Sequence, residues 1–352
     1  MSNILVNSTA EIEEIKGLLE KSLPSYRQAY SDRTSWLMAC ISELAYVKFN
    51  PLFKNQTKDY FIKKISELID GNKIKYLNQL IEIVGYDPEK EMDKLKENVE
   101  LLNMEIKETF DNDGTQAILL ANQSSIFLGF RGTEPTSMKD IKSDTKATTM
   151  VCESGGKIHT GFSEAFDRVA IQIQTALDKD EFKDKPLFIT GHSLGGALDT
   201  IAAKKLTHHA GIAACYTFGS PRVGDPKWTT NIKTPIYRIV NAADPVTMLP
   251  PSSETISIVS WILQFIPYIG QTIRNFMLSK FGGYYHLGDM RYLTNCSNKD
   301  FSQVALLYSV SFIFRVKAFL VKKLPFTKVL ADHSITTYRE KLKIIAHTKN
   351  II

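Results

Sequence analysis

The sequence predicts an α/β protein with a mostly parallel central sheet that is covered by helices on both faces. Short apolar runs, rich in β-branched and aromatic residues, begin at Gln116 and occupy residues 116–121, 125–130, 186–190, 214–218 and 236–240. Helical patterns at 162–178 and 194–208 separate the later runs. Buried strands that alternate with helices are typical of a parallel sheet packed on both sides.

The chain before this pattern is predicted to be helical. Residues 9–35 have apolar residues at helical spacing behind Ser8 and Thr9, which are suitable N-caps, and a second helix is predicted from Ser35 to about Phe49. Residues 56–108 are charged and amphipathic, with helical patterns at 62–69, at 77–83 and again after Pro88. We predict an N-terminal helical region at 1–112, which packs on the core or binds a partner. A main domain at 113–345 follows, with an insertion at about 252–330.

Composition limits the function classes. The net charge of +5 over 352 residues gives no argument for nucleic-acid binding, but the basic surplus is local. Residues 251–330 contain nine Lys or Arg and three acids, a net charge of +6. The four cysteines are scattered, which predicts neither a thiol metal site nor a disulfide framework. Acidic residues interrupt the N-terminus before any apolar run, so we expect a cytoplasmic protein or export by a leaderless route.

The decisive motif lies at residues 186–206. An apolar strand ends at Thr190, the residues Gly191-His192-Ser193-Leu194-Gly195 follow, and an Ala- and Leu-rich helix begins at once. This is G-x-S-x-G in the strand–turn–helix setting that a nucleophilic serine requires. A tight turn leaves no room for side chains two positions before and after the serine, which explains both glycines. The alternative is a glycine-rich turn with an incidental serine.

A serine nucleophile needs a base, and the base needs an orienting acid. Asp244 follows the strand at 236–240, at the strand end where parallel sheets place their chemistry. The candidate bases after Asp244 are His286, His333 and His347, and the last lies in a polar tail. The residues alone do not decide whether His286 or His333 is the base.

Several motifs taken together resemble the class 3 lipases, a family with the α/β-hydrolase fold. They cover about residues 32–49 and 113–342 and are FRGT (130–133), HTGF (159–162), GHSLGG (191–196), TFGSPRVGD (217–225), NAADPVTMLP (241–250) and DHSITTY (332–338). The resemblance implies Ser193 as nucleophile, Asp244 as triad acid and His333 as base, with His286 in a non-catalytic element. It also implies Thr133 as one oxyanion donor, beside the backbone N–H of Leu194.

These residues predict a carboxylic ester hydrolase that acts on lipids through an acyl-enzyme, without a metal or cofactor. The alternative from another class is a catalytically silent lipid- or protein-binding module on the same fold. Within the enzyme class, phospholipase A1 or lysophospholipase activity competes with triacylglycerol lipase activity. Oligomeric state is not predicted.

The inserted segment bears on that choice. It contains apolar runs at 253–266 and 304–314, both shorter than a bilayer span, and they are followed by basic residues. They form extra core helices, an acyl-binding cap or a peripheral membrane anchor. The stretch 134–149, which forms a lid in related lipases, has only Met138 and Ile141 as large apolar groups. We therefore expect a preference for phospholipid or lysophospholipid over triacylglycerol, with residues 251–330 mediating the contact.

Overall fold

The architecture is taken from a computed structural model. It describes residues 3–21, 23–24, 29–49, 66, 87–132, 149–152, 155–252, 256–257, 275, 283–296, 300–311, 313–315, 317 and 331–350. Most of the predicted helix at 62–69, all of the one at 77–83, and most of 134–149 and of 253–266 lie outside these residues.

An eight-stranded sheet forms the centre of the molecule, in the order β1-β2-β3-β6-β7-β8-β9-β10. The strands are β1 (Glu105–Asn112), β2 (Thr115–Ala121), β3 (Ile126–Phe130), β6 (Leu187–His192), β7 (Ile212–Phe218), β8 (Ile236–Asn241), β9 (Asp289–Leu293) and β10 (Leu306–Tyr308). The consecutive pairs from β3 to β9 are parallel, and the pairs at the two edges are antiparallel. The mostly parallel sheet is confirmed, and all five predicted apolar runs form strands.

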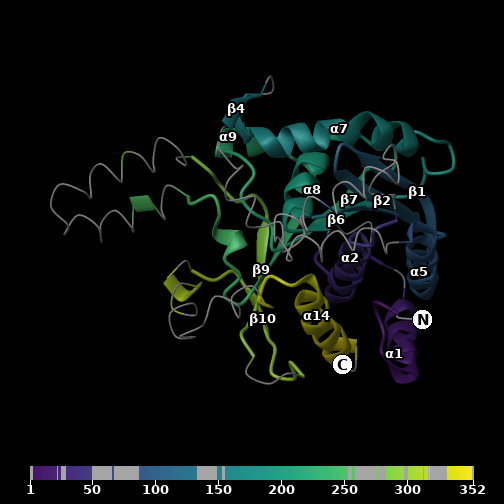
Figure 1. Ribbon diagram of the computed structural model, residues 1–352. Coiled ribbons are helices and arrows are strands. Elements are labelled where there is room, and N and C mark those ends of the chain that lie inside the picture. The colour runs from purple at the N-terminus through teal and green to yellow at the C-terminus, as the bar shows by residue number, and fades with distance from the viewer. Residues whose placement is uncertain are drawn as a thin grey trace.

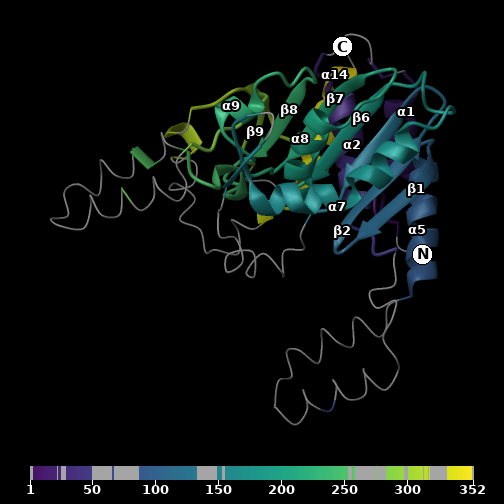
Figure 2. The same cartoon turned by 90° about the horizontal axis from the view of Figure 1, so that it is seen from above.

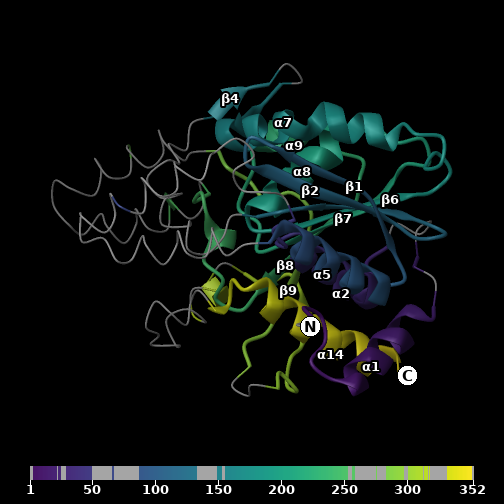
Figure 3. The ribbon, with the colours of Figure 1, turned by 45° about the vertical axis from the view of Figure 1, so that its right-hand side comes forward.

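Helices cover both faces of this sheet, as predicted (Figures 1 and 3). On one face lie α7 (Thr160–Leu177) and α8 (Leu194–Lys205), with the short α9 (Pro226–Thr229) and the hairpin of β4 (Thr149–Val151) and β5 (Lys157–His159) nearby. On the other lie α2 (Asp32–Leu44), α5 (Pro88–Leu101), α14 (Ile335–Asn350) and α1 (Thr9–Leu19). Each face has its own apolar core. In Figure 2, which shows the molecule from above, α7 lies across the strands of the sheet.

Helix α2 is buried on nearly all sides, because the sheet lies on one side of it and α14 on the other. Polar contacts fix this packing. The Arg339 guanidinium on α14 pairs with the buried Glu43 carboxylate on α2 and donates from Nη1 to the carbonyl oxygen of Leu5 at 3.0 Å. The Thr336 hydroxyl donates to the same carboxylate at 2.6 Å. These contacts anchor the C-terminal helix, and therefore the segment just before it, on the N-terminal region.

Several local predictions require correction. The helix predicted over 9–35 ends at Leu19, and α2 begins at Asp32 because the side chain of Ser31 accepts a hydrogen bond from Thr34 N as its N-cap. Residues 105–112, inside the predicted helical region 1–112, form strand β1, which pairs with β2 across the predicted domain boundary. Residues 306–308, within an apolar run predicted as helix, form β10. Sheet pairing overrides local propensity in both strands. The domain division itself stays a prediction.

Part of the predicted insertion belongs to the core. β9 pairs in parallel with β8, and β10 pairs with β9 at the edge of the sheet. The Arg291 guanidinium on β9 lies over the rings of Tyr30, Tyr237 and Tyr308, with distances of 4.9, 5.6 and 4.7 Å to their centroids. Among the described residues, the structure contains no helix long and apolar enough to span a bilayer.

Candidate active site

Ser193 lies on a sharp turn between β6 and α8. Its backbone angles are φ 59° and ψ −123°, a conformation that non-glycine residues adopt at a cost of about 1–3 kcal/mol. The turn is held by a hydrogen bond from Ser193 N to the carbonyl oxygen of Phe218 on β7, at 2.9 Å. Strained backbone of this kind occurs mainly where function requires it.

The two glycines of the motif are required by close packing, as predicted. A Cβ at Gly191 would lie 2.7 Å from the carbonyl carbon of Gly195 and 2.9 Å from the carbonyl oxygen of Phe130. A Cβ at Gly195 would collide with the same Phe130 carbonyl. Only hydrogen fits at either position, so the elbow can form only with glycine on both sides of the serine.

The structure brings Ser193, His333 and Asp244 together although 140 residues separate the first two. Ser193 Oγ lies 2.9 Å from His333 Nε2. On the other side of the ring, Nδ1 lies 2.9 and 3.0 Å from the two oxygens of Asp244. All three residues are buried. A hydroxyl that donates to an imidazole, which in turn donates to a carboxylate, is the arrangement that activates serine as a nucleophile.

Asp244 has further donors. The Tyr338 hydroxyl donates to Asp244 Oδ2 at 2.6 Å, and the backbone N–H of Val246 donates to Oδ1 at 3.0 Å. Burial and the neighbouring carboxylate raise the pKa of Tyr338 well above its usual value, so the phenol stays a donor. Tyr338 Oη also accepts from Asn241 N at 3.0 Å, which connects α14 to the end of β8. These bonds fix the orientation of the Asp244 carboxylate relative to the His333 ring.

His192, the residue before the nucleophile, supports the backbone of His333. Its Nε2 donates to the carbonyl oxygen of His333 at 2.6 Å, and its Nδ1 accepts from the Tyr46 hydroxyl at 2.8 Å. Burial and the nearby His333 ring lower the pKa of His192 well below its usual value, which keeps the ring neutral. The sequence did not single out either His192 or Tyr46. No local pattern shows that Tyr46, which follows α2, reaches the turn after β6.

A second buried network fixes the segment that precedes α14. Asn241 Nδ2 donates to the carbonyl oxygen of Asp332 at 2.8 Å, and Lys341 Nζ donates to Asn241 Oδ1 at 2.7 Å. Asp332 Oδ2 accepts from the N–H of Ala243 at 3.1 Å. The residues that precede His333 and Asp244 in the chain are therefore bonded to one another, which holds these two side chains close together.

The remaining predicted site residues lie as follows. His286 Nε2 donates to the carbonyl oxygen of Thr247 at 2.6 Å, so its ring supports the segment after Asp244. Leu194 is the first residue of α8, where the backbone N–H has no acceptor within the helix. Thr133 lies outside the described residues. A Cβ at the preceding Gly132 would collide with the carbonyl oxygen of His192, so the FRG segment contacts the turn.

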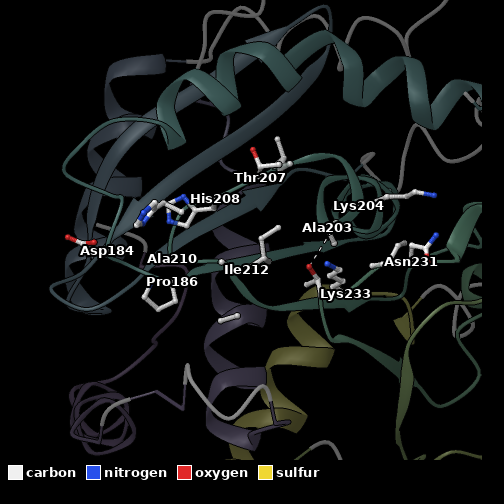
Figure 4. Close-up of a pocket in the computed structure, with 16 residues that line it drawn as sticks. Asp184, Pro186, Ala203, Lys204, Thr207, His208, Ala210, Ile212, Asn231 and Lys233 are labelled. Atoms are coloured by element: carbon white, nitrogen blue, oxygen red, sulfur yellow. Dashed lines mark hydrogen bonds between the residues drawn. The ribbon is translucent and has the colours of Figure 1, made fainter. Parts of the chain in front are cut away.

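The broad pocket in Figure 4 is separate from these residues. Asp184, Pro186, His208, Ile212 and Lys233 are among its lining residues, which come from the segments before β6, β7 and β8 and from the end of α8. This is the amino-terminal edge of the parallel strands, whereas Ser193 and Asp244 follow the carboxyl ends of β6 and β8. His208 Nε2 donates to the carbonyl oxygen of Lys185 at 2.7 Å, in keeping with a structural role.

The sheet and the strained elbow have the form of the α/β-hydrolase fold, and a hydrogen-bonded Ser–His–Asp set is the arrangement found in serine hydrolases. Residues 127–254 match the model of the lipase (class 3) family. The resemblance read from the motifs is confirmed.

Two curated relatives illustrate the match. A secreted mono- and diacylglycerol lipase 1 of Fusarium solani is 40% identical over 104 residues, which are 28% of this chain and 31% of that protein. A lipase of Rhizomucor miehei is 32% identical over 145 residues, 38% of this chain and 39% of that protein. The chain thus spans less than half the length of these relatives. Among solved structures, lipase II from Rhizopus niveus has a TM-score of 0.49 and 19% identity, covering 94% of this chain and 95% of that chain.

One prediction is wrong. We expected a cytoplasmic protein or leaderless export, but the Fusarium solani relative is named a secreted lipase, and this finding contradicts the prediction. The prediction rested on acidic residues near the N-terminus and on scattered cysteines. Such features describe the first residues of a chain and its thiols, and they do not fix the compartment in which an α/β-hydrolase core works.

Proposed function

We propose that this protein hydrolyses carboxylic esters of lipids by a Ser–His–Asp mechanism through an acyl-enzyme. The observation that supports this most directly is the continuous set of hydrogen bonds from Ser193 Oγ through the His333 ring to Asp244. The burial of Asp244 and its bonds to Tyr338 and Val246 also support the proposal, because the carboxylate must be held in place to orient the base.

Each residue has a distinct part in the proposed reaction. His333 Nε2 takes the proton of Ser193 as Oγ attacks the ester carbonyl, and the same imidazolium then protonates the leaving alcohol. Water deprotonated by His333 releases the fatty acid. Asp244 keeps the proton of His333 on Nδ1 and stabilises the imidazolium. We propose that the backbone N–H groups of Leu194 and Thr133 stabilise the oxyanion. Each donor lowers the activation free energy by about 3 kcal/mol.

The proposed substrates are glycerolipid esters. The named activity of the Fusarium solani relative supports acylglycerols as a class. Within the class we keep the preference for phospholipid or lysophospholipid over triacylglycerol as a proposal, based on the polar stretch at 134–149.

The substrate test begins with covalent labelling. A fluorophosphonate probe should label the wild type and leave Ser193→Ala unlabelled. Fatty-acid release from purified phosphatidylcholine, lysophosphatidylcholine, diacylglycerol and triacylglycerol then ranks the substrates. Absence of labelling in the wild type would favour the silent binding module. Faster release from triacylglycerol than from either phospholipid would contradict the proposed preference alone.

We also propose that residues 251–330 contact the membrane peripherally. Tyr308, Ile313 and Phe314 expose 64%, 66% and 46% of their surface. Apolar side chains of this kind, close in sequence to lysines, suit an anionic lipid surface. Two of the nine basic residues are engaged within the fold and are not counted toward lipid binding. Arg315 is buried, and Arg291 lies over three tyrosine rings.

The membrane test uses Ser193→Ala protein and co-sedimentation with anionic or neutral vesicles. We expect binding to anionic vesicles that weakens in high salt, because the screening length falls from about 10 Å at 0.1 M to about 3 Å at 1 M. Adding Ile313→Ser and Phe314→Ser should reduce it at least threefold. Ile171→Ser is the matched control, since Ile171 on α7 is 80% exposed. Equal binding to both kinds of vesicle, or no binding to either, would contradict the membrane contact. It would favour the alternative in which residues 251–330 form extra core.

A further inference from the structure

The two backbone carbonyls that flank His333 both accept hydrogen bonds from buried side chains. The carbonyl oxygen of Asp332, in the peptide bond before His333, accepts from Asn241 Nδ2 at 2.8 Å. The carbonyl oxygen of His333 itself accepts from His192 Nε2 at 2.6 Å. Asn241 is the last residue of β8 and His192 the last residue of β6, and both are buried. The backbone of the proposed base is therefore held from two sides by the ends of two strands.

Each of these two donors is set in its form by a third residue. The Tyr46 hydroxyl donates to His192 Nδ1 at 2.8 Å, which leaves the His192 hydrogen on Nε2. Asn241 has a similar ambiguity, because a half-turn of its amide exchanges an oxygen acceptor for N–H donors. Lys341 Nζ lies 2.7 Å from Asn241 Oδ1. An ammonium group only donates, so Lys341 turns the amide oxygen toward itself and the amide nitrogen toward the Asp332 carbonyl.

Lys341 is well placed to fix this orientation. It lies on α14 and is 2% exposed, and its Nζ also donates to the carbonyl oxygen of Thr294, just after β9, at 2.8 Å. Burying an ammonium group is costly even where it is hydrogen-bonded, and an apolar side chain would fill the same space at less cost. The presence of a lysine here therefore favours a role for the donor itself.

Asn241 also contacts the segment that carries the triad acid. Its backbone N–H donates to the Tyr338 hydroxyl at 3.0 Å, and that hydroxyl donates to Asp244 Oδ2. The Asn241 carbonyl accepts from Asp244 N at 2.9 Å. If the amide turned, its oxygen would face the Asp332 carbonyl, and two acceptors at hydrogen-bond distance repel each other. The segment before α14, and His333 with it, would then move away from Asp244.

We propose that Lys341 is a positioning residue for the base His333. By donating to Asn241 Oδ1, it selects the amide orientation that holds the His333 backbone in place and keeps the imidazole against Asp244. Lys341 itself is remote from the reacting atoms and acts through Asn241 and the Asp332 carbonyl. This inference rests on the proposed function, because it assigns Lys341 a part in the same Ser–His–Asp site.

Asn241→Asp separates positioning from a simple tie between α14 and β8. The aspartate keeps its contact with Lys341 but presents an acceptor to the Asp332 carbonyl. We expect kcat for a short soluble ester to fall by roughly 10²-fold, with KM within about twofold of the wild type, because displaced catalytic groups are costly. Lys341→Met, which frees the amide to turn, should lower kcat by about tenfold. If Lys341 only ties the two elements together, Asn241→Asp keeps the wild-type kcat, and that result overturns the proposal.

The double variant gives a sharper test, because the second substitution should repair the first. A buried carboxyl that has lost its cation becomes neutral, and its O–H can then donate to the Asp332 carbonyl. Adding Lys341→Met to Asn241→Asp should therefore raise kcat about tenfold at pH 7. A double variant that is slower than Asn241→Asp contradicts the proposal. Lys343→Met is the matched control on α14, since Lys343 Nζ lies 3.0 Å from Glu11 Oε1. It should lower stability and leave kcat unchanged.

A second readout needs no turnover. The ¹H resonance of the His333 Nδ1–H, assigned with His333→Ala in ¹⁵N-histidine protein, should be sharp in the wild type and broadened by exchange in Asn241→Asp. An unchanged resonance in Asn241→Asp overturns the positioning role, whereas a wild type that neither hydrolyses esters nor reacts with fluorophosphonate overturns the proposed function. Urea unfolding checks that each variant is folded. If Lys341→Met is unfolded, Asn241→Asp decides alone, because it keeps the contact with Lys341.

Discussion

The imidazole Nε2 of His192 lies 2.6 Å from the backbone carbonyl oxygen of His333. His192, which precedes the proposed nucleophile Ser193, therefore fixes the backbone of the proposed base. The two rings also pack together, with 4.4 Å between their centroids. This contact couples the elbow after β6 to the segment before α14. The Tyr46 hydroxyl fixes the tautomer of His192 by donating to Nδ1, which leaves the hydrogen on Nε2.

Tyr46→Phe should therefore lower kcat without removing the triad. Without the donor at Nδ1, His192 loses the interaction that selects its tautomer, and we expect a fall of about tenfold in kcat with little change in KM. Hydrolysis of a short soluble ester measures both constants. Tyr308→Phe, at a tyrosine that is 64% exposed, is the control. An unchanged kcat in Tyr46→Phe would show that the tautomer of His192 is set by other groups.

Gly219→Ala should inactivate the enzyme. Gly219 has φ +58°, and a Cβ there would lie 2.7 Å from Asp244 Oδ2 and 3.0 Å from His333 Nδ1. Separating these two groups should reduce kcat/KM by at least 10²-fold, because small displacements of catalytic groups are costly. Gly211→Ala is a matched control, with φ +79° and no atom within 4 Å of the added Cβ. It should cost about 1–2 kcal/mol of stability and leave activity intact.

The two histidines should respond differently to alanine. His333→Ala removes the base and should be as damaging as Ser193→Ala, with a loss of several orders of magnitude in kcat. His286→Ala leaves the Thr247 carbonyl without its donor and should cost about 1–3 kcal/mol of stability, with activity reduced only through packing. Urea unfolding and short-ester hydrolysis of both variants separate the effects. An active His333→Ala beside a dead His286→Ala would reverse the proposed roles.

Acid should destabilise the fold below about pH 6.5. Burial lowers the pKa of His159 from 6.5 to about 4, so between these values the unfolded chain binds a proton that the folded chain does not. Stability from this group is therefore complete above pH 6.5 and is lost as the pH falls toward 4, by roughly 1 kcal/mol per pH unit. His192 and His286, whose pKa values burial also lowers, act with the same sign.

His159→Phe should reduce this slope, since the ring already stacks on Phe162 with 4.0 Å between centroids. The measurement is the urea midpoint between pH 4.5 and 7.5. His209→Phe, at an exposed histidine, should keep the wild-type slope. Equal slopes in all three proteins would mean that His159 is protonated in the folded state.

The sequence by itself determined the strand–turn–helix around Ser193, the mostly parallel sheet and the position of Asp244 just after a strand. These features are local: a strand, two glycines and a helix within about twenty residues are sufficient to specify the elbow. Local patterns also located α7, α8 and the buried strands, because their apolar spacing differs clearly between period 2 and period 3.6.

Only the tertiary structure decided which distant groups meet. Tyr46 reaches His192, Lys341 reaches Asn241 and Arg315 reaches Thr247 across 146, 100 and 68 residues. The reading of β1 as helix overlooked the local turn at Asp113 and Gly114, through which β1 pairs with β2. The strand β10 was read as helix, because it gains its hydrogen bonds from β9 and not from its own sequence neighbours. Pairings of this kind are set by how the layers pack, which no local spacing of residues records.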